Sequence, residues 1–224
     1  MTKMTDGMRW FKTSFSAPVG AAIANTPFTL NLMTALAVQE SFEVWGNLFQ
    51  TAMLPGEILD LCVGDTIDGP GRKAFPTSKA NLLAATRGSE IFAAARASLE
   101  AVGTVNATYH KIFLANPNKF CHGFGIFQLD IQFCKQDPDY FINHRWKSFD
   151  TCLGKAIDEL KAAQGRAKLG GKAVLTDLEL AHVAIAYNAG SFDPARGLKQ
   201  GHMDDSGKFY GELIAQFIAL AATV

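Results

Sequence analysis

Residues 26–41 read TPFTLNLMTALAVQES, and this stretch sets the fold class that the sequence predicts. Thr26 and Pro27 are typical of an N-cap and of the first position of a helix. Apolar residues then recur at helical spacing, namely Phe28, Leu32, Met33, Leu36 and Ala37. The stretch therefore predicts a helix over 27–40 that ends near Glu40 and Ser41.

Most of the remaining chain also carries helical patterns. The further predicted helices lie within 43–63, 78–102, 139–164, 176–189 and 207–222. Thr176, with Glu179 three residues later, is a capping box that marks the start of one of them. The chain has no internal repeat. The sequence therefore predicts a mostly α protein.

Three segments are not clearly helical. Residues 64–78 and 116–125 are rich in Gly, Pro, Asn and Asp, which is typical of loops. The stretch GIFQLDIQF at 125–133 is compatible with a short strand or with the start of a helix. Long ordered loops are often functional, so the loop at 64–78 is a candidate for a site.

Composition limits the class of protein. The chain has 224 residues, of which 48% are hydrophobic and 19% charged, and it carries 21 basic and 21 acidic side chains. We expect a single domain over 1–224, present as a monomer. Without net charge, no overall field recruits nucleic acid, which leaves a local basic patch as the alternative. The N-terminus lacks the apolar run of a signal peptide, and the final run, IAQFIALAATV, is too short to span a membrane.

The cysteine and histidine spacings give no metal or cofactor signal. Cys62, Cys121, Cys134 and Cys152 form no CxxC pair, and the five histidines have no metal-ligand spacing. We expect buried free thiols, with a Cys121–Cys134 bridge as the alternative. We expect neither a metal nor a cofactor.

Three short segments carry a resemblance to a known family. They are ALAVQES at 35–41, GFGIFQLD at 123–130 and AIAYNAG at 184–190. In this order they resemble the motifs of goose-type lysozymes and lytic transglycosylases, which share the lysozyme-like α-helical fold. About eighty residues separate Glu40 from Gly123, which is long for that family. The resemblance therefore implies a lysozyme-like domain with a helical insertion over about 47–115.

The resemblance makes Glu40 the general acid of a glycosidase. Cleaving a glycosidic bond requires a proton for a poor leaving group while positive charge develops on the sugar. A carboxylic acid in an apolar setting can supply that proton near neutral pH. The resemblance implies that the substrate is a β-1,4-linked N-acetylhexosamine polymer, peptidoglycan or chitin, outside the cell or in the periplasm.

The same resemblance implies that Ser41, Gly123, Gly125 and Gln128 bind the substrate, together with Tyr187 and Asn188. The glycines would let the backbone approach the sugar. The structural alternatives are a tight turn in which backbone groups satisfy Gln128, and a helix end at which Asn188 and Gly190 are stop signals.

Asp130 decides between two reactions. A carboxylate across a water-sized gap from the acid suits inverting hydrolysis, and Asp130 is the expected group, ahead of Asp65 and Asp68. The alternative is that Asp130 caps a helix beginning near Ile131. The protein would then be a lytic transglycosylase, which forms 1,6-anhydro products. A non-enzymatic sugar-binding protein, with its cleft closed by the insertion, is the third reading.

Overall fold

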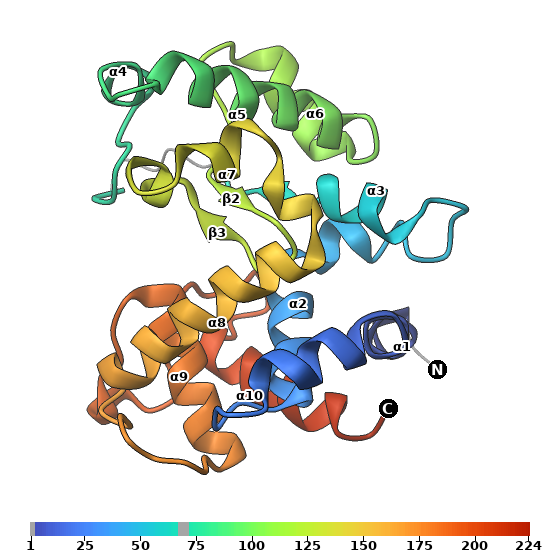
Figure 1. The fold of residues 1–224 in the computed structure, drawn as a ribbon, viewed down its shortest axis with the longest axis vertical. Coiled ribbons are helices and arrows are strands. Elements are labelled where there is room, and N and C mark those ends of the chain that lie inside the picture. The colour runs from blue at the N-terminus through green and yellow to red at the C-terminus, as the bar shows by residue number, and fades with distance from the viewer. Residues whose placement is uncertain (1–2, 67–71) are drawn as a thin grey trace. The chain divides into compact units, whose positions relative to one another are not determined.

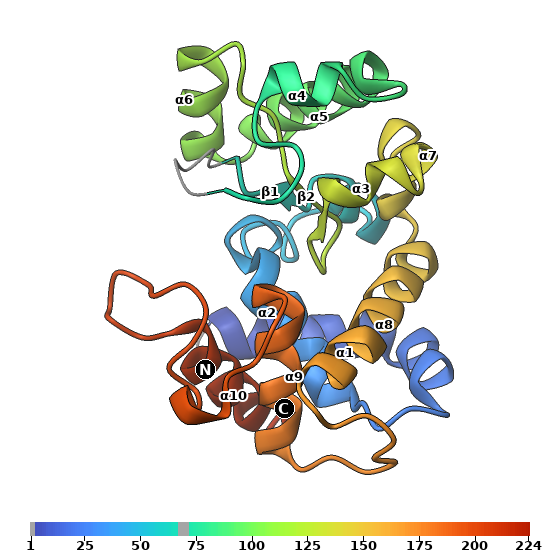
Figure 2. The same cartoon turned by 90° about the vertical axis from the view of Figure 1, so that its left-hand side faces the viewer.

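The computed structural model describes residues 3–66 and 72–224, and it is mostly helical (Figures 1 and 2). The chain divides into two compact units. We call Met1–Glu40 with Leu153–Val224 the terminal unit, and Ser41–Cys152 the central unit. No helix of the described residues is long and apolar enough to cross a bilayer.

The terminal unit consists of helices. Its elements are α1 (Lys3–Ile23), the first part of α2 (Leu30–Trp45), most of α8 (Phe149–Arg166), α9 (Asp177–Ala189), the 3₁₀ turn η3 (Pro194–Arg196) and α10 (Tyr210–Ala221). Helix α10 packs against α9 and α1. Lys12 of α1 donates to the carbonyls of Ala221 and Val224, at 2.6 and 3.0 Å, so it binds the open carbonyl end of α10.

The bounds predicted for the helix over 27–40 were wrong at both ends. Helix α2 begins at Leu30 instead of residue 27, because Oγ1 of Thr29 accepts the Leu32 amide hydrogen as an N-cap does. Oγ1 of Thr26 instead accepts from the Phe28 amide, in the turn before the helix. The helix also continues past Glu40 to Trp45, whose side chain is fully buried.

The central unit combines short helices with a small sheet. Its elements are α3 (Pro55–Asp60), β1 (Val63–Gly64), α4 (Lys79–Leu83), α5 (Gly88–Gly103), α6 (Ala107–Ala115), β2 (Gly123–Phe124), β3 (Leu129–Asp130), η1 (Ile131–Lys135), α7 (Pro138–Ile142) and η2 (Arg145–Lys147). The strands are antiparallel in the order β1-β2-β3, with Val63 opposite Phe124 and Gly123 opposite Asp130. Helix α5 lies beside α6 in both views (Figures 1 and 2).

The helix predicted over 139–164 is broken in the structure. Helix α7 ends at Ile142, His144 takes a left-handed backbone with φ of 50°, and α8 begins at Phe149. Aromatic packing accounts for the break, since the Trp146 ring lies 4.8 Å from the Phe124 ring and is fully buried. A continuous helix through residue 146 would point the Trp146 side chain in a different direction.

Two local predictions are confirmed. Thr176 and Glu179 form the capping box at the start of α9. All four cysteines are free and buried, so the Cys121–Cys134 bridge is absent. Burial raises the pKa of the Cys134 thiol to about 11, and it raises the pKa of the Cys62 and Cys121 thiols further. These thiols are therefore core side chains in their neutral form.

Candidate functional site

Glu40 contacts a tyrosine from the far end of the chain. The phenol of Tyr210, the first residue of α10, donates to Oε1 of Glu40 at 2.6 Å. Tyr210 is 5% exposed, whereas Glu40 is partly exposed. The pair therefore joins a buried donor to a partly exposed glutamate.

Tyr210 stays protonated at physiological pH. Burial is the main reason why its pKa lies well above the ordinary value, and the negative charge of Glu40 adds to the effect. Its backbone is fixed by a 2.8 Å hydrogen bond from the Tyr210 amide to the carbonyl of His202. Tyr210 is thus a permanent hydrogen-bond donor held at one oxygen of Glu40.

The AYNAG motif lies beside this pair at the end of α9. Tyr187 is close enough to contribute to the raised pKa of Tyr210. Asn188 is exposed, and its Oδ1 would lie 3.5 Å from a Cβ added at Gly201. Gly190 ends the helix with a left-handed φ of 74°. The motif therefore stops a helix, as the structural alternative expected, and it also places Tyr187 near Tyr210.

This arrangement can hold a carboxylic acid in one orientation. A neutral Glu40 that accepts the Tyr210 hydrogen bond through its carbonyl oxygen Oε1 would carry its proton on Oε2. A general acid needs such a fixed proton, aimed at the oxygen of the leaving group. We call Glu40, Tyr187, Asn188 and Tyr210 the acid cluster.

The glycine-rich motif forms the β2–β3 hairpin of the central unit, and both of its glycines are buried. A Cβ at Gly123 would lie 2.2 Å from Oε1 of Gln128, and one at Gly125 would lie 2.5 Å from Sγ of Cys152. Gly125 also has a φ of 83°. Close packing against side chains of the protein itself thus accounts for both glycines, and their approach to a substrate stays a prediction.

Gln128 is bound by the backbone of its own unit. Its Nε2 donates to the carbonyls of Cys62, at 3.1 Å, and Gly125, at 2.8 Å. Its φ is 52°, a left-handed value that is uncommon outside glycine. Gln128 therefore closes the hairpin turn, as the structural alternative expected, and its contact with a sugar stays a prediction.

Ser41 is buried as well. Its hydroxyl donates to the carbonyl of Ile126 at 2.8 Å, and the residue is 3% exposed. The resemblance assigned Ser41 to substrate binding, but the structure places it against the hairpin backbone. The buried Ser41 hydroxyl therefore attaches the first residue of the central unit to the hairpin.

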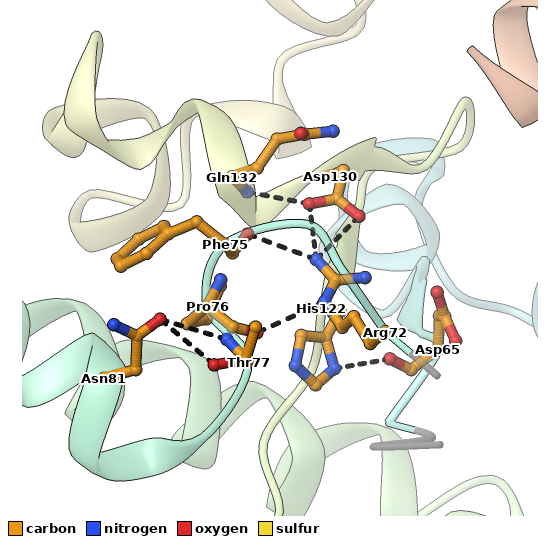
Figure 3. A network of polar contacts seen from close by, with 9 residues as sticks. All are labelled: Asp65, Arg72, Phe75, Pro76, Thr77, Asn81, His122, Asp130 and Gln132. Atoms are coloured by element: carbon orange, nitrogen blue, oxygen red, sulfur yellow. Dashed lines mark hydrogen bonds and ion pairs between the residues drawn. The ribbon is translucent and has the colours of Figure 1, made fainter. Parts of the chain in front are cut away.

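Asp130 is held by Arg72 (Figure 3). Nη2 of Arg72 lies 2.8 Å from Oδ1 and 3.0 Å from Oδ2, and the side chains are 14% and 26% exposed. Oδ1 also accepts the Gln132 amide hydrogen at 2.7 Å, which caps η1. The capping alternative is therefore observed, and an ion pair engages the carboxylate in addition.

Arg72 also fastens the chain segment that follows it. Its guanidinium donates to the carbonyls of Phe75 and Pro76, at 3.3 and 3.2 Å (Figure 3). His122 lies in the same region, 1% exposed, with Nδ1 2.7 Å from the carbonyl of Asp65. Asp65 thus contributes a backbone contact here, while Asp68 lies outside the described residues.

The predicted site residues form two sets, one in each unit. Glu40, Tyr187 and Asn188 belong to the terminal unit, and Ser41, Gly123, Gly125, Gln128 and Asp130 belong to the central unit. The water-sized gap between Glu40 and Asp130 stays a prediction. Across residues 3–66 and 72–224, no three His, Cys, Asp or Glu side chains are arranged to hold a metal ion.

Two residues of these sets were missed by the sequence analysis. Tyr210 begins a predicted helix, but no local spacing links it to Glu40. Arg72 lies in a Gly- and Pro-rich loop, where an arginine is usually solvated. The one available signal was the loop's length, which marked it as a candidate without pointing to Asp130.

The comparisons with known proteins found no counterpart: no protein-family model, no curated protein and no solved structure matches the chain.

Proposed function

We propose that the protein is a glycosidase that cleaves β-1,4 linkages of an N-acetylhexosamine polymer, with peptidoglycan as its substrate and Glu40 as the general acid. The observation that carries the proposal is the 2.6 Å hydrogen bond from Tyr210 to Glu40, beside Tyr187 of the AYNAG motif. The choice of an amino-sugar polymer rests on the resemblance of the three motifs.

Glu40 would act by donating its proton to the glycosidic oxygen. Oε1 accepts the hydrogen bond of a buried phenol, and in this proposal Oε2 carries the proton of the neutral acid. After transfer, the new carboxylate keeps the Tyr210 hydrogen bond, which strengthens as negative charge develops on the acceptor. Tyr210 would therefore stabilise the ionised product form of the acid and hold its orientation through the step.

The surroundings of Asp130 favour a lytic transglycosylase over a hydrolase. In an inverting hydrolase a carboxylate positions the attacking water, whereas the Asp130 carboxylate is already engaged by Arg72 and by the Gln132 amide. In a transglycosylase the substrate's own N-acetyl group and C6 hydroxyl serve as the nucleophiles, so Glu40 suffices. This changes the expectation from sequence, which put hydrolysis first.

Product analysis on purified peptidoglycan tests the proposal. We expect the wild type to release muropeptides with 1,6-anhydro ends, Glu40→Gln to lose at least about a hundredfold in rate, and Asp130→Asn to retain the wild-type products. Glu43→Gln is the matched control, because it makes the same change three residues later at an exposed carboxylate.

The alternatives give different results. Reducing ends in the products, together with loss of activity in Asp130→Asn, would show that the protein is a hydrolase instead of a transglycosylase. Cleavage of chitin oligomers but not of peptidoglycan would change the substrate. If the wild type cleaves neither polymer, the proposal of a glycosidase is wrong and the sugar-binding scaffold takes its place.

A further inference from the structure

We propose that the turn formed by His202–Lys208 is a polymer-binding element of the Glu40 site, and that Met203 is its contacting side chain. The ligand class is a chain of N-acetylated sugars, whose rings present apolar C–H faces. The inference rests on the proposed function, since it concerns the same polymer. It assigns substrate contact to a segment outside the three motifs.

Backbone hydrogen bonds attach the turn to Tyr210 of the acid cluster. The Tyr210 amide donates to the carbonyl of His202 at 2.8 Å, and the Gly211 amide donates to that of Gln200 at 3.1 Å. Met203 and Phe209 form a β-bridge across the base of the turn. The residue that holds Glu40 is therefore also the residue on which the turn is built.

Close packing fixes the base of the turn in addition. A Cβ added at Gly201 would lie 2.5 Å from Cβ of Tyr210 and 3.5 Å from Oδ1 of Asn188. Only a glycine allows the backbone to pass this close to the acid cluster, and the φ of Gly201 is 83°. The side chains of Tyr210 and Asn188 therefore lie next to Gly201, the residue that precedes the turn.

The tip of the turn is ordered by Asp204. Its Oδ1 accepts from the Ser206 amide at 2.9 Å, the Ser206 hydroxyl at 2.7 Å and the Lys208 amide at 2.9 Å. The Ser206 hydroxyl contributes most to keeping the pKa of Asp204 below its ordinary value. The turn is therefore pre-organised, which lowers the entropy cost of binding a ligand.

Met203 is held outward on this ordered turn. It is 51% exposed, next to exposed His202. The loop that precedes α10, drawn in orange-red, projects beyond the helices of the terminal unit (Figure 2). Methionine is a flexible, polarizable side chain that adapts to irregular apolar surfaces. Met203 follows His202, whose carbonyl accepts the Tyr210 amide hydrogen, so in this proposal it contacts the sugars that flank the bond presented to Glu40.

Met203→Ser and Leu178→Ser provide a matched test. Leu178 is 53% exposed in the same unit, but it lies nine residues before Tyr187 on α9, about 14 Å along the helix. For peptidoglycan we expect Met203→Ser to raise KM about threefold to tenfold with kcat nearly unchanged. We expect Leu178→Ser to match the wild type. Asp204→Ala, which releases the tip, should raise KM in the same way.

Binding is measured alongside turnover, by sedimentation with insoluble peptidoglycan in the Glu40→Gln background. Equal KM and equal binding for the Met203 and Leu178 variants would overturn the inference, while loss of turnover in Glu40→Gln would still support the proposed function. If the wild type lacks turnover, the proposed function fails. Weaker binding of the Met203 variant alone would then support the turn as a binding element, and absence of binding would overturn it.

Discussion

Tyr210 and Glu40 are 170 positions apart in the sequence, and the phenol of the first donates a 2.6 Å hydrogen bond to the carboxyl group of the second. The donor is buried and the acceptor is partly exposed. A second pair has the same chemistry in the central unit, where the Tyr109 phenol donates to Oε1 of Glu43 at 2.8 Å. The protein thus contains an internal control for the effect of a tyrosine on a glutamate.

Tyr210→Phe should lower kcat about tenfold to a hundredfold and leave KM nearly unchanged. The change removes one hydrogen bond to a charged acceptor, and that bond is strongest after Glu40 has given up its proton. Initial rates on peptidoglycan measure the effect. Tyr109→Phe should retain wild-type kcat, and equal rates for all three proteins would show that Tyr210 has no role in the reaction.

The same two tyrosines predict how stability depends on alkaline pH. Burial and a neighbouring glutamate raise the pKa of both phenols, so the folded state keeps protons that the unfolded chain releases. Their contribution is complete below about pH 10, the ordinary tyrosine pKa, and is lost as pH rises above it.

Replacing either tyrosine with phenylalanine should therefore flatten the decline of the unfolding free energy above pH 10. The slope should change by at most about 1.4 kcal/mol per pH unit for each tyrosine. Urea unfolding between pH 9 and 12 measures it. An unchanged slope in both variants would mean that these phenols titrate alike in the folded and unfolded states.

Gly125→Ala and Gly154→Ala should change stability in opposite directions. A Cβ at Gly125 meets the buried Sγ of Cys152 at 2.5 Å, on a backbone with φ of 83°, so we expect a loss of at least about 2 kcal/mol. Gly154 lies inside α8 with open space around it, so alanine should add up to about 1 kcal/mol. Urea midpoints measure both, and a Gly125 variant as stable as the wild type would contradict the close packing.

Arg96 should be a stability determinant of the central unit. Its guanidinium donates to the carbonyls of Phe113, Asn116 and Lys119, at 2.7 to 2.9 Å, and lies 4.0 Å from the centre of the Phe113 ring. Arg96→Met removes every donor and should cost about 2 kcal/mol. Arg96→Lys keeps the charge but cannot reach all three carbonyls. Its unfolding free energy, measured by urea titration, should therefore lie between those of the wild type and of Arg96→Met.

Local patterns predicted much of the helical content and little of the site. The capping box at Thr176 and the stop at Gly190 were readable because each depends on neighbours within one turn. The start of α2 was misplaced because Thr26 and Thr29 are both possible caps, and tertiary packing selected Thr29. Residues 139–164 were read as one helix because the packing of Trp146 that accompanies its break involves Phe124, which is distant in sequence.

The sequence by itself determined the mostly α class, because helical periodicity is a local property of a chain, and the order of three motifs along it pointed to Glu40 as the candidate acid. Only the tertiary structure decided which groups those residues contact. It directed Gln128 and Ser41 to backbone carbonyls, paired Asp130 with Arg72 and brought Tyr210 to Glu40. Apart from the bond of Gln128 to Gly125, these contacts join distant segments, and a hydrogen bond between distant segments leaves no periodic trace in the sequence.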